Sequence, residues 1–393
     1  MSLSPHPSPP GVMPVDALVI GGGLQGLLVM DRLSSAGFSC VLVSASDLGA
    51  GQTLHSHGVL NTGFGMAGPE PIRILRDVAL PDLARRGIRT YGEWGAISPA
   101  SPPAGETVPA PAGVEMRGGV FLRLPEVNID KRELVSALAR GLEDRILGGR
   151  VAGVERAADG SVRTVDVAPA GGSPLRFVPG AVIVAAGTGS KALLRRLGAG
   201  EGQLEDLKHR RVHVLCVRGR SSVLPILNFV SPADSLFVAA HERDGVVTWY
   251  ATPMLFDAPH IEDVPGDASA EVDQAFAERG WDVLFRLFPP LKSLPGLSFA
   301  TYAGFRQDIG DQPGAPKCEQ IESAPNVIAA LPSGLLGAWP VAVRTAKLVS
   351  EITTEKRPQP VIPAAAMVVR VGDTYEDAGR IEWSANASSA RPA

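Results

Sequence analysis

The chain has few cysteines, which form the disulfides of small secreted domains, and no excess of the basic residues that bind nucleic acid. Only three of its 393 residues are cysteine, and Cys40, Cys216 and Cys318 follow no metal-site spacing. The formal net charge is −4, which gives no basic footprint and little support for nucleic-acid binding, and aromatic residues make up only 5%. We therefore expect reduced cysteines, no bound metal and no nucleic-acid partner.

Long apolar runs are also missing. No stretch reaches the roughly 18–20 apolar residues that a membrane-spanning helix needs. Residues 1–14 are rich in Ser and Pro, lack a signal-peptide pattern and are expected to form a disordered leader. The polar tail from about Thr374 onward is expected to be loose as well. These features predict a cytoplasmic protein, and high use of Ala, Gly, Pro and Arg favours a bacterial source.

A glycine-rich turn between two apolar runs is the strongest motif present. Residues 17–20 (ALVI) precede Gly21, Gly23 and Gly26, and residues 40–43 (CVLV) follow a segment of helical periodicity. This order of strand, turn, helix and strand places a dinucleotide pyrophosphate on a helix N-terminus. We expect the first glycine to allow the turn, the second to admit the phosphates and the third to allow close helix packing.

The end of the second predicted strand departs from NAD-binding units. Those units usually carry Asp or Glu there for the ribose hydroxyls, whereas this chain has Ser44 and Ala45. Either Asp47 makes this contact, or hydroxyl groups make a weaker one. Small and polar residues over 48–58 leave room for a bulky planar group beyond the pyrophosphate.

Three blocks, in this order, resemble the D-amino-acid-oxidase-like FAD-dependent oxidoreductases. The blocks are the glycine turn with residues 49–63, then 180–190 (GAVIVAAGTGS), then 302–306 (YAGFR) with 334–340 (GLLGAWP). This family includes glycine, sarcosine and dimethylglycine oxidising enzymes and L-2-hydroxyglutarate oxidases. The resemblance covers Val15 to Ile352 and implies an α/β fold: a Rossmann-like FAD-binding domain with a parallel sheet, plus an antiparallel β-rich substrate domain with helices.

The implied domains are discontinuous. The FAD-binding domain takes residues 15–90, 125–207 and 300–353, the substrate domain takes 91–124 and 208–299, and 354–393 form a C-terminal extension. Sequence periodicity predicts helices over 71–89, 130–140 and 271–288, a hairpin around Asp159 and Gly160, and an antiparallel sheet within 212–250.

The resemblance also implies which residues bind FAD. Val151 matches a position whose backbone meets the adenine, and a helix expected to begin at Val341 directs its N-terminus at the flavin pyrimidine. The full set is Gly21, Gly23, Leu24, Gln25, Gly26, Ser44, Ala45, Gln52, Thr53, His55, Ser56, Val151, Ala186, Gly187, Gly334, Leu335, Leu336 and Gly337.

Two histidines follow the glycine turn. The position of His55 can be covalently attached to flavin in the dimethylglycine and sarcosine group, and a Gln-Thr-x-His segment places a histidine near flavin in the hydroxyglutarate oxidases. Both cases imply that His55 reaches the flavin, with or without a covalent bond; the alternative is a histidine hydrogen-bonded within its loop. His57 is a candidate catalytic base. No carboxylate or cysteine accompanies the pair at metal-ligand spacing.

Flavin-dependent dehydrogenation asks little of side chains beyond orienting the substrate and excluding water. Arg306 matches the family arginine that binds a substrate carboxylate, and its planar fork suits bidentate pairing. Gln307 follows it where the family often has Pro. Tyr250 and Tyr302 are candidates for the same cavity. Residues 331–337 lack the Gly-Asp pair of FAD-dependent aromatic-ring hydroxylases, which argues against that class.

Three functions stay open from the sequence. The first is dehydrogenation of a C–N bond in a small amine or amino acid by hydride transfer to flavin N5. The second is oxidation of a 2-hydroxy acid to a 2-oxo acid. The third is a non-redox flavoprotein that binds or cyclises a larger metabolite. The redox functions imply a small carboxylated substrate and reoxidation by oxygen or an unknown carrier.

Overall fold

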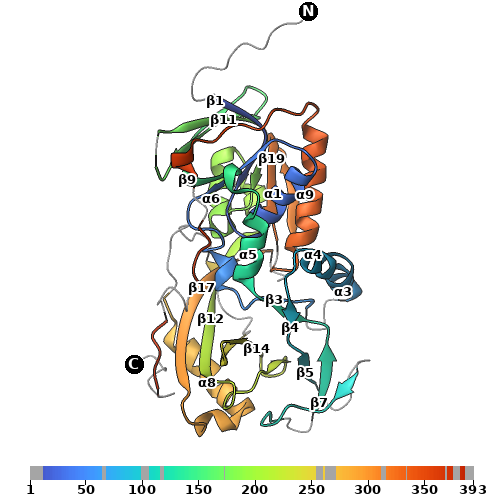
Figure 1. The fold of residues 1–393 in the computed structure, drawn as a ribbon, viewed down its shortest axis with the longest axis vertical. Helices are drawn as coiled ribbons and strands as arrows, with labels where there is room; N and C mark the ends of the chain where they lie inside the picture. Colours follow the sequence, from blue (N-terminus) through green and yellow to red (C-terminus); the bar gives the residue numbers. More distant parts are fainter. Residues whose placement is uncertain are drawn as a thin grey trace, which may run out of the picture. The chain divides into compact units, whose positions relative to one another are not determined.

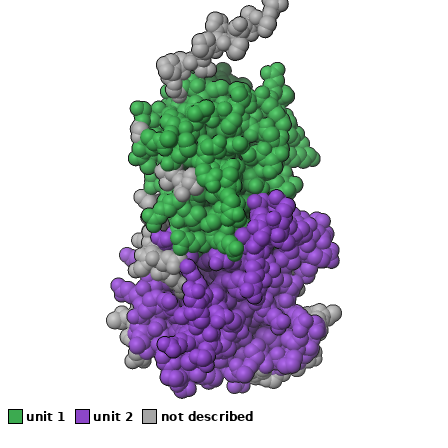
Figure 2. Space-filling model, in the orientation of Figure 1, with its two compact units in different colours: residues 1–54, 132–208, 307–372 green, residues 55–131, 209–306, 373–393 purple. Residues whose placement is uncertain are grey.

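The computed structural model describes residues 12–63, 68–98, 106–115, 119–171, 173–253, 260–261, 271–310, 316–332, 334–367, 370–374 and 381–385. The chain forms two compact units (Figure 2). Unit 1 contains residues 1–54, 132–208 and 307–372, and unit 2 contains 55–131, 209–306 and 373–393. The units divide the chain differently from the predicted domains, most clearly at 55–90, which fall in unit 2. Residues 12–14 of the predicted leader begin a strand; the rest of it lies outside the described residues.

Unit 1 is built on a seven-stranded sheet with a parallel centre, as predicted. All five residues of its second strand are buried, which is typical of parallel sheets covered on both faces. The parallel neighbours, in spatial order, are β9 (Ile146–Arg156), β2 (Cys40–Ser44), β1 (Val12–Ile20), β11 (Leu175–Val184) and β19 (Ala324–Leu331).

Two antiparallel strands complete this sheet. The predicted hairpin is present: β10 (Val162–Pro169) returns antiparallel to β9 after the turn at Asp159 and Gly160, and it also pairs with β11. At the other end of the sheet, β18 (Lys317–Ile321) pairs antiparallel with β19.

The glycine turn connects β1 to α1 (Leu24–Ser35) at very close range. Gly21 has φ +127°, and a Cβ atom there would lie 2.2 Å from the Ala185 carbonyl oxygen. A Cβ atom on Gly26 would lie 1.8 Å from the Gly21 carbonyl oxygen. Both positions therefore require glycine, because any side chain would displace backbone. The motif's spacing is thus set by the packing of α1 on its own turn.

The last long helix of unit 1, α9 (Ala338–Ile352), packs against α1 (Figure 1). It begins three residues before the predicted start at Val341. Pro340 lies in its first turn, where a backbone N–H has no intrahelical partner, so the proline is tolerated there.

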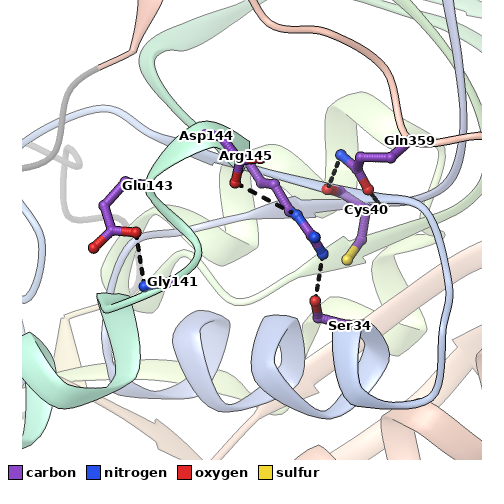
Figure 3. A network of polar contacts seen from close by, with 7 residues as sticks. All are labelled: Ser34, Cys40, Gly141, Glu143, Asp144, Arg145 and Gln359. Carbon is purple, nitrogen blue, oxygen red and sulfur yellow. Dashed lines mark hydrogen bonds and ion pairs between the residues drawn. The ribbon is translucent and has the colours of Figure 1, made fainter.

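The chain beyond α9 returns to the sheet (Figure 3). The Gln359 side-chain amide donates to the Cys40 carbonyl at 3.1 Å and accepts from the Cys40 N–H at 3.0 Å. Nearby, the Arg145 guanidinium donates to the Ser34 hydroxyl and lies 3.5 Å from the Asp144 carboxylate. Burial raises the pKa of the Cys40 thiol to about 12, so this residue is a neutral core side chain, as predicted. The described part of the chain contains no disulfide.

Most of unit 2 is organised around a nine-stranded, largely antiparallel sheet, as predicted. One face packs on α8 (Gln274–Leu287), whose N-cap Asp273 accepts from the Phe276 N–H at 3.0 Å. The strands are β5 (Trp94–Ser98), β6 (Thr107–Val108), β7 (Val120–Leu124), β12 (Leu207–Arg220), β13 (Asn228–Ser231), β14 (Leu236–Arg243), β15 (Val246–Pro253), β16 (His260–Ile261) and β17 (Ser298–Ile309). A separate three-stranded sheet contains β3 (Val59–Leu60), β4 (Thr90–Tyr91) and β8 (Val127–Ile129).

The predicted helix over 71–89 is helical but not a regular α-helix. It consists of α3 (Pro69–Ile74), the π-helical η1 (Leu75–Ala79) and α4 (Leu80–Arg85). Pro81 has no N–H to donate to the preceding turn, which interrupts the regular hydrogen-bond ladder there. The remaining helices are α2 (Gln52–His55), α5 (Lys131–Ala139), α6 (Ser190–Leu197) and α7 (Glu201–Leu204), with short 3₁₀ turns η2 (Glu143–Arg145), η3 (Gly187–Gly189), η4 (Pro289–Lys292) and η5 (Ala364–Ala366).

Within the tail predicted to be loose from about Thr374, the structure describes Thr374 and residues 381–385, and residues 381–385 pack on unit 2; the rest of that prediction lies outside the described residues. Ser384 exchanges two backbone hydrogen bonds with Phe299 of β17, at 2.8 and 2.9 Å. Ile381 is buried in a cluster with Tyr250 and Tyr302. The backbone pair and the apolar contacts of Ile381 and Trp383 therefore hold residues 381–385 on unit 2. Among the described residues, no helix has both the length and the apolar character to cross a membrane.

Replacing Gly26 with alanine should destabilise the protein. The new methyl group would meet the Gly21 carbonyl oxygen, and overpacking of this kind costs about 2–3 kcal/mol. Gly202 in α7 has no atom within 4 Å of its Cβ position, so Gly202→Ala should be neutral or slightly stabilising. Urea unfolding of both variants tests this contrast, and equal free energies of unfolding would contradict it.

Candidate active site

Four parallel strands of unit 1 bring most of the predicted FAD-binding residues to one edge of the sheet. The strands end in register, with Ile20 of β1 paired to Val43 of β2 and to Val184 of β11, which in turn pairs with Ala329 of β19. The carboxyl ends of parallel strands meet at one edge, where doubly wound sheets bind ligands. The residues following these ends are Gly21–Gly26, Ser44, Ala186, Gly187 and Gly334–Gly337.

The start of α1 fits an anionic ligand. Its N-cap, Gly23, has no side chain, its first turn has no acidic residue, and a Cβ atom on Gly23 would meet only the Thr53 hydroxyl, at 3.3 Å. Thr53 accepts a hydrogen bond from the Leu24 N–H at 3.0 Å, which ties α2 to this helix start. The Gln25 side chain is buried, and neither its amide nitrogen nor its oxygen has a hydrogen-bond partner. Buried amides are normally bonded, so the turn suits the polar pyrophosphate of a dinucleotide.

The later glycine turns leave backbone uncovered at the same edge. Gly187 has φ +56° and Gly334 has φ +74°. A Cβ atom on Gly334 would meet nothing within 4 Å, and one on Gly187 would meet only Gln52, at 3.4 Å. Leu335 and Leu336 continue this turn into α9. Both turns thus offer backbone that a planar cofactor can approach closely.

The loop after β2 makes hydrogen bonds of its own. The Ser44 hydroxyl donates to the Ser46 carbonyl at 2.6 Å, and the Asp47 carboxylate lies 3.6 Å from the Arg370 guanidinium. Ala45 is exposed. The Val151 carbonyl, expected near the adenine, accepts from Arg196 at 2.8 Å. The ribose and adenine contacts of this chain therefore stay predictions.

Unit 2 places Tyr250 and Tyr302 in one cluster. Val214, Cys216 and Ala300 belong to the same cluster, whereas their sequence neighbours Leu215, Val217 and Phe299 pack in the core with α8. Because successive strand residues point to opposite faces, the two tyrosines lie on the face away from α8. We call this the tyrosine face. The Tyr302 hydroxyl donates to the His55 carbonyl at 3.2 Å, which links this face to the end of α2.

Arg306 follows Tyr302 by four residues on β17, so strand alternation places it on the tyrosine face. Gly304 lies between them, and a Cβ atom there would meet nothing within 4 Å. The positive charge of Arg306 contributes to lowering the pKa of His57. The structure thus groups the four predicted catalytic residues in one unit, with open space beside the arginine.

His57 is half-buried and already hydrogen-bonded. Its Nε2 atom lies 2.6 Å from the Thr252 hydroxyl, and its ring makes edge contacts with Phe237 and Tyr250, at centroid distances of 4.6 and 6.4 Å. Burial, followed by the charges of Lys131 and other neighbours, lowers the pKa of His57 to about 3. The imidazole is neutral near pH 7 and a weak base, which argues against the predicted role as general base.

Lys131, His241 and Tyr91 belong to the same cluster, although the sequence did not single them out. His241 lies between the Tyr91 hydroxyl and the His57 carbonyl, 2.6 Å from each. Lys131 donates to the Ser56 carbonyl and lies 5.6 Å from the centre of the Tyr250 ring. These residues come from segments far apart in the chain. In the sequence, His241 directly follows an apolar strand pattern and Lys131 stands at the start of a predicted helix. Neither local pattern indicates that the two residues meet.

A match to a known family agrees with this architecture. The family model described as "FAD dependent oxidoreductase" (DAO) matches residues 100–348, and the chain belongs to this family. The resemblance found in the sequence is confirmed, and the protein is an FAD-dependent oxidoreductase. In the part of the chain that the structure describes, no three His, Cys, Asp or Glu side chains gather as a metal site.

Similar proteins extend over nearly the whole chain. The probable FAD-dependent oxidoreductase PA4991 of Pseudomonas aeruginosa is 26% identical over 376 residues, which cover 86% of this chain and 89% of that protein. Its crystal structure matches with a TM-score of 0.73 at 23% identity, over 95% of this chain and 100% of that one. Two further crystal structures share the fold. Glycine oxidase from Geobacillus kaustophilus matches with a TM-score of 0.64 at 14% identity, over 92% of this chain and 100% of that one. L-proline dehydrogenase from P. horikoshii matches with a TM-score of 0.66 at 12% identity, over 89% of this chain and 96% of that one.

The free energy of unfolding should fall on acidification because of His57 and His241. Burial is the main cause that lowers their pKa values, to about 3 and about 4, from the ordinary 6.5. Below about pH 6.5 the unfolded chain therefore binds more protons, and stability should drop by up to about 1.4 kcal/mol per pH unit for each histidine. Above that pH these groups contribute no further change. Urea unfolding between about pH 7.5 and pH 5 measures the slope.

The variant His241→Gln supplies the control for this slope. Glutamine keeps a donor for the His57 carbonyl but does not titrate, so the variant should lose one histidine's share of the acid sensitivity. A slope equal to that of the wild type would show that His241 is not held neutral in the folded protein.

Proposed function

We propose that the protein dehydrogenates a C–N bond of a small carboxylated amine or amino acid. The observation that carries this proposal is the placement of Arg306 on the tyrosine face, beside the open space at Gly304. A guanidinium there pairs with a substrate carboxylate through two parallel hydrogen bonds. When bound, FAD supplies the hydride acceptor at its N5 atom, and oxygen or another carrier reoxidises it.

The charges of unit 2 favour an amine over an alcohol as the reacting group. Burial is the main cause that lowers the pKa of His57, and the positive charges of Lys131 and Arg306 add to it; the same charges disfavour a protonated substrate amine. A neutral amine gives up hydride more readily than an ammonium group. A 2-hydroxy acid must instead lose its hydroxyl proton, and His57, with a pKa of about 3, is a weak acceptor for that proton.

The two tyrosines orient the substrate and limit the access of water. Tyr250 and Tyr302 are both buried, with 7% and 6% of their surface exposed. Their rings offer flat apolar walls for the substrate carbon skeleton, and the bond from Tyr302 to the His55 carbonyl fixes one of them. We further propose that His55, the last residue of α2, contacts the flavin. A covalent bond from His55 to the flavin and a cytoplasmic location stay predictions.

Anaerobic reduction of the flavin tests the reaction class. The purified holoprotein, mixed with amino acids and N-methyl amino acids, should lose its visible flavin absorption, whereas 2-hydroxy acids should leave it unchanged. Bleaching by hydroxy acids alone would transfer the proposal to C–O oxidation. Bleaching by neither class would support the non-redox alternative. Colour that stays with acid-precipitated protein would establish covalent attachment.

Substitution of Arg306 tests the substrate carboxylate. Arg306→Ala should weaken substrate binding by roughly 10- to 100-fold, as expected for the loss of about 1.5–3 kcal/mol in charged hydrogen bonds. Arg306→Lys should fall between, because it keeps the charge but loses the fork. Arg220→Ala, at the exposed end of β12, serves as the control. Unchanged substrate affinity in Arg306→Ala, with normal FAD content, would remove this role.

A further inference from the structure

Three consecutive carbonyl groups of the segment His55–His57 are each held by a side chain. Tyr302 donates to the His55 carbonyl at 3.2 Å, Lys131 to the Ser56 carbonyl, and His241 to the His57 carbonyl at 2.6 Å. Loops are usually held by backbone or by water, so three side-chain donors in a row is an unusual concentration. The path of this segment is therefore set by residues that are distant in sequence.

The hydrogen bonds of His241 fix its tautomer. Its Nε2 atom faces a carbonyl oxygen, which only accepts, so Nε2 carries the proton. Its Nδ1 atom is then an acceptor, and the Tyr91 hydroxyl donates to it at 2.6 Å. Burial, and next the charge of Lys131, lowers the pKa of His241 to about 4, whereas exposed Asp130 raises it less strongly. Tyr91 thus acts on the segment through a neutral, oriented imidazole.

Lys131 occupies a position that is unfavourable for a lysine on two counts. It is the first residue of α5, where the helix dipole disfavours a cation, and only 9% of its surface is exposed. Its ammonium group lies 5.6 Å from the centre of the Tyr250 ring, a cation–π contact. Local rules that are broken in this way are expected where a residue serves a site.

Gly58, which directly follows the segment, is tightly enclosed by its neighbours. Gly58 has φ +67°, and a Cβ atom there would lie 2.9 Å from the Ile129 carbonyl oxygen and 3.1 Å from the His241 ring. The Ile129 N–H also donates to the Gly58 carbonyl at 2.8 Å. The segment therefore has little freedom to shift at this end while the donors are in place.

We propose that Lys131, His241 and Tyr91 are positioning residues that fix the backbone of His55–His57, so that the His55 side chain is presented to the flavin in one orientation. This inference rests on the proposed contact between His55 and the flavin. The three residues act through the segment's carbonyl groups and do not themselves touch the substrate.

Hydrogen exchange of the purified holoprotein tests the backbone part of the proposal, and it does not depend on any reaction of the flavin. In Lys131→Met, peptides that cover residues 52–60 should exchange about tenfold faster, as expected when one charge-assisted hydrogen bond is lost from a local opening equilibrium. Lys131→Arg should restore slow exchange because it keeps the donor and the charge. Tyr91→Phe, which removes a single hydroxyl, should give a smaller increase and covers the case in which Lys131→Met does not fold.

Lys191→Met is the matched control. Lys191 is also 9% exposed but lies in α6 of unit 1, so its replacement should leave exchange over 52–60 unchanged. Wild-type exchange over 52–60 in both Lys131→Met and Tyr91→Phe would overturn the proposal, as would equal acceleration of every peptide.

The circular dichroism of the bound flavin tests the second part of the proposal. Lys131→Met should change the visible flavin band, and Lys131→Arg should retain the wild-type band. Faster exchange with an unchanged flavin band would mean that the segment does not orient His55 toward the flavin. Both measurements stand even if no amine bleaches the flavin, so failure of the proposed reaction is distinguished from failure of this inference.

Discussion

The close approach of Gly26 to the Gly21 carbonyl is the constraint on which the nucleotide end of this protein depends. It sets where α1 begins relative to β1, and so where the start of α1, with glycine at its N-cap, lies at the carboxyl edge of the parallel sheet. Thr53 of α2 hydrogen-bonds to that same helix start, so the position of α2 follows from it. If the glycine turn moved, α2 would move with it, and so would His55, the last residue of that helix.

Features that depend on neighbouring residues were predictable from the sequence, whereas features that join distant segments were not. The glycine turn, the hairpin at Gly160 and the strands of unit 2 carry local signals of spacing and alternation. The cluster around His57 joins residues from β4, β14, β15 and α5, and no local pattern links them. Residues 381–385, within the tail predicted to be loose, are ordered in the structure, because composition does not reveal the backbone pair between Ser384 and Phe299.

Unit 2 combines the positive charges of Lys131 and Arg306 with the neutral imidazoles of His57 and His241. This combination agrees with a sequence in which no strong acid–base pair is evident. Burial, and next the charge of Lys131, lowers the pKa of His57, and the hydrogen bond with Thr252 occupies its Nε2 atom. Under the proposed function, these charges act mainly on the protonation state of the bound substrate. A site of that kind binds an anionic group at one end of a ligand and an uncharged, electron-rich group at the other.

Two residues late in the sequence complete hydrogen bonds of an early part of unit 1. Gln359 hydrogen-bonds to the backbone of Cys40 at the start of β2, and the Arg370 carbonyl accepts from the Leu48 N–H in the loop that follows β2. The backbone groups of Cys40 and Leu48 therefore find these partners only after residues 359–370 have folded back onto unit 1, which makes this part of the sheet depend on contacts of very long sequence separation.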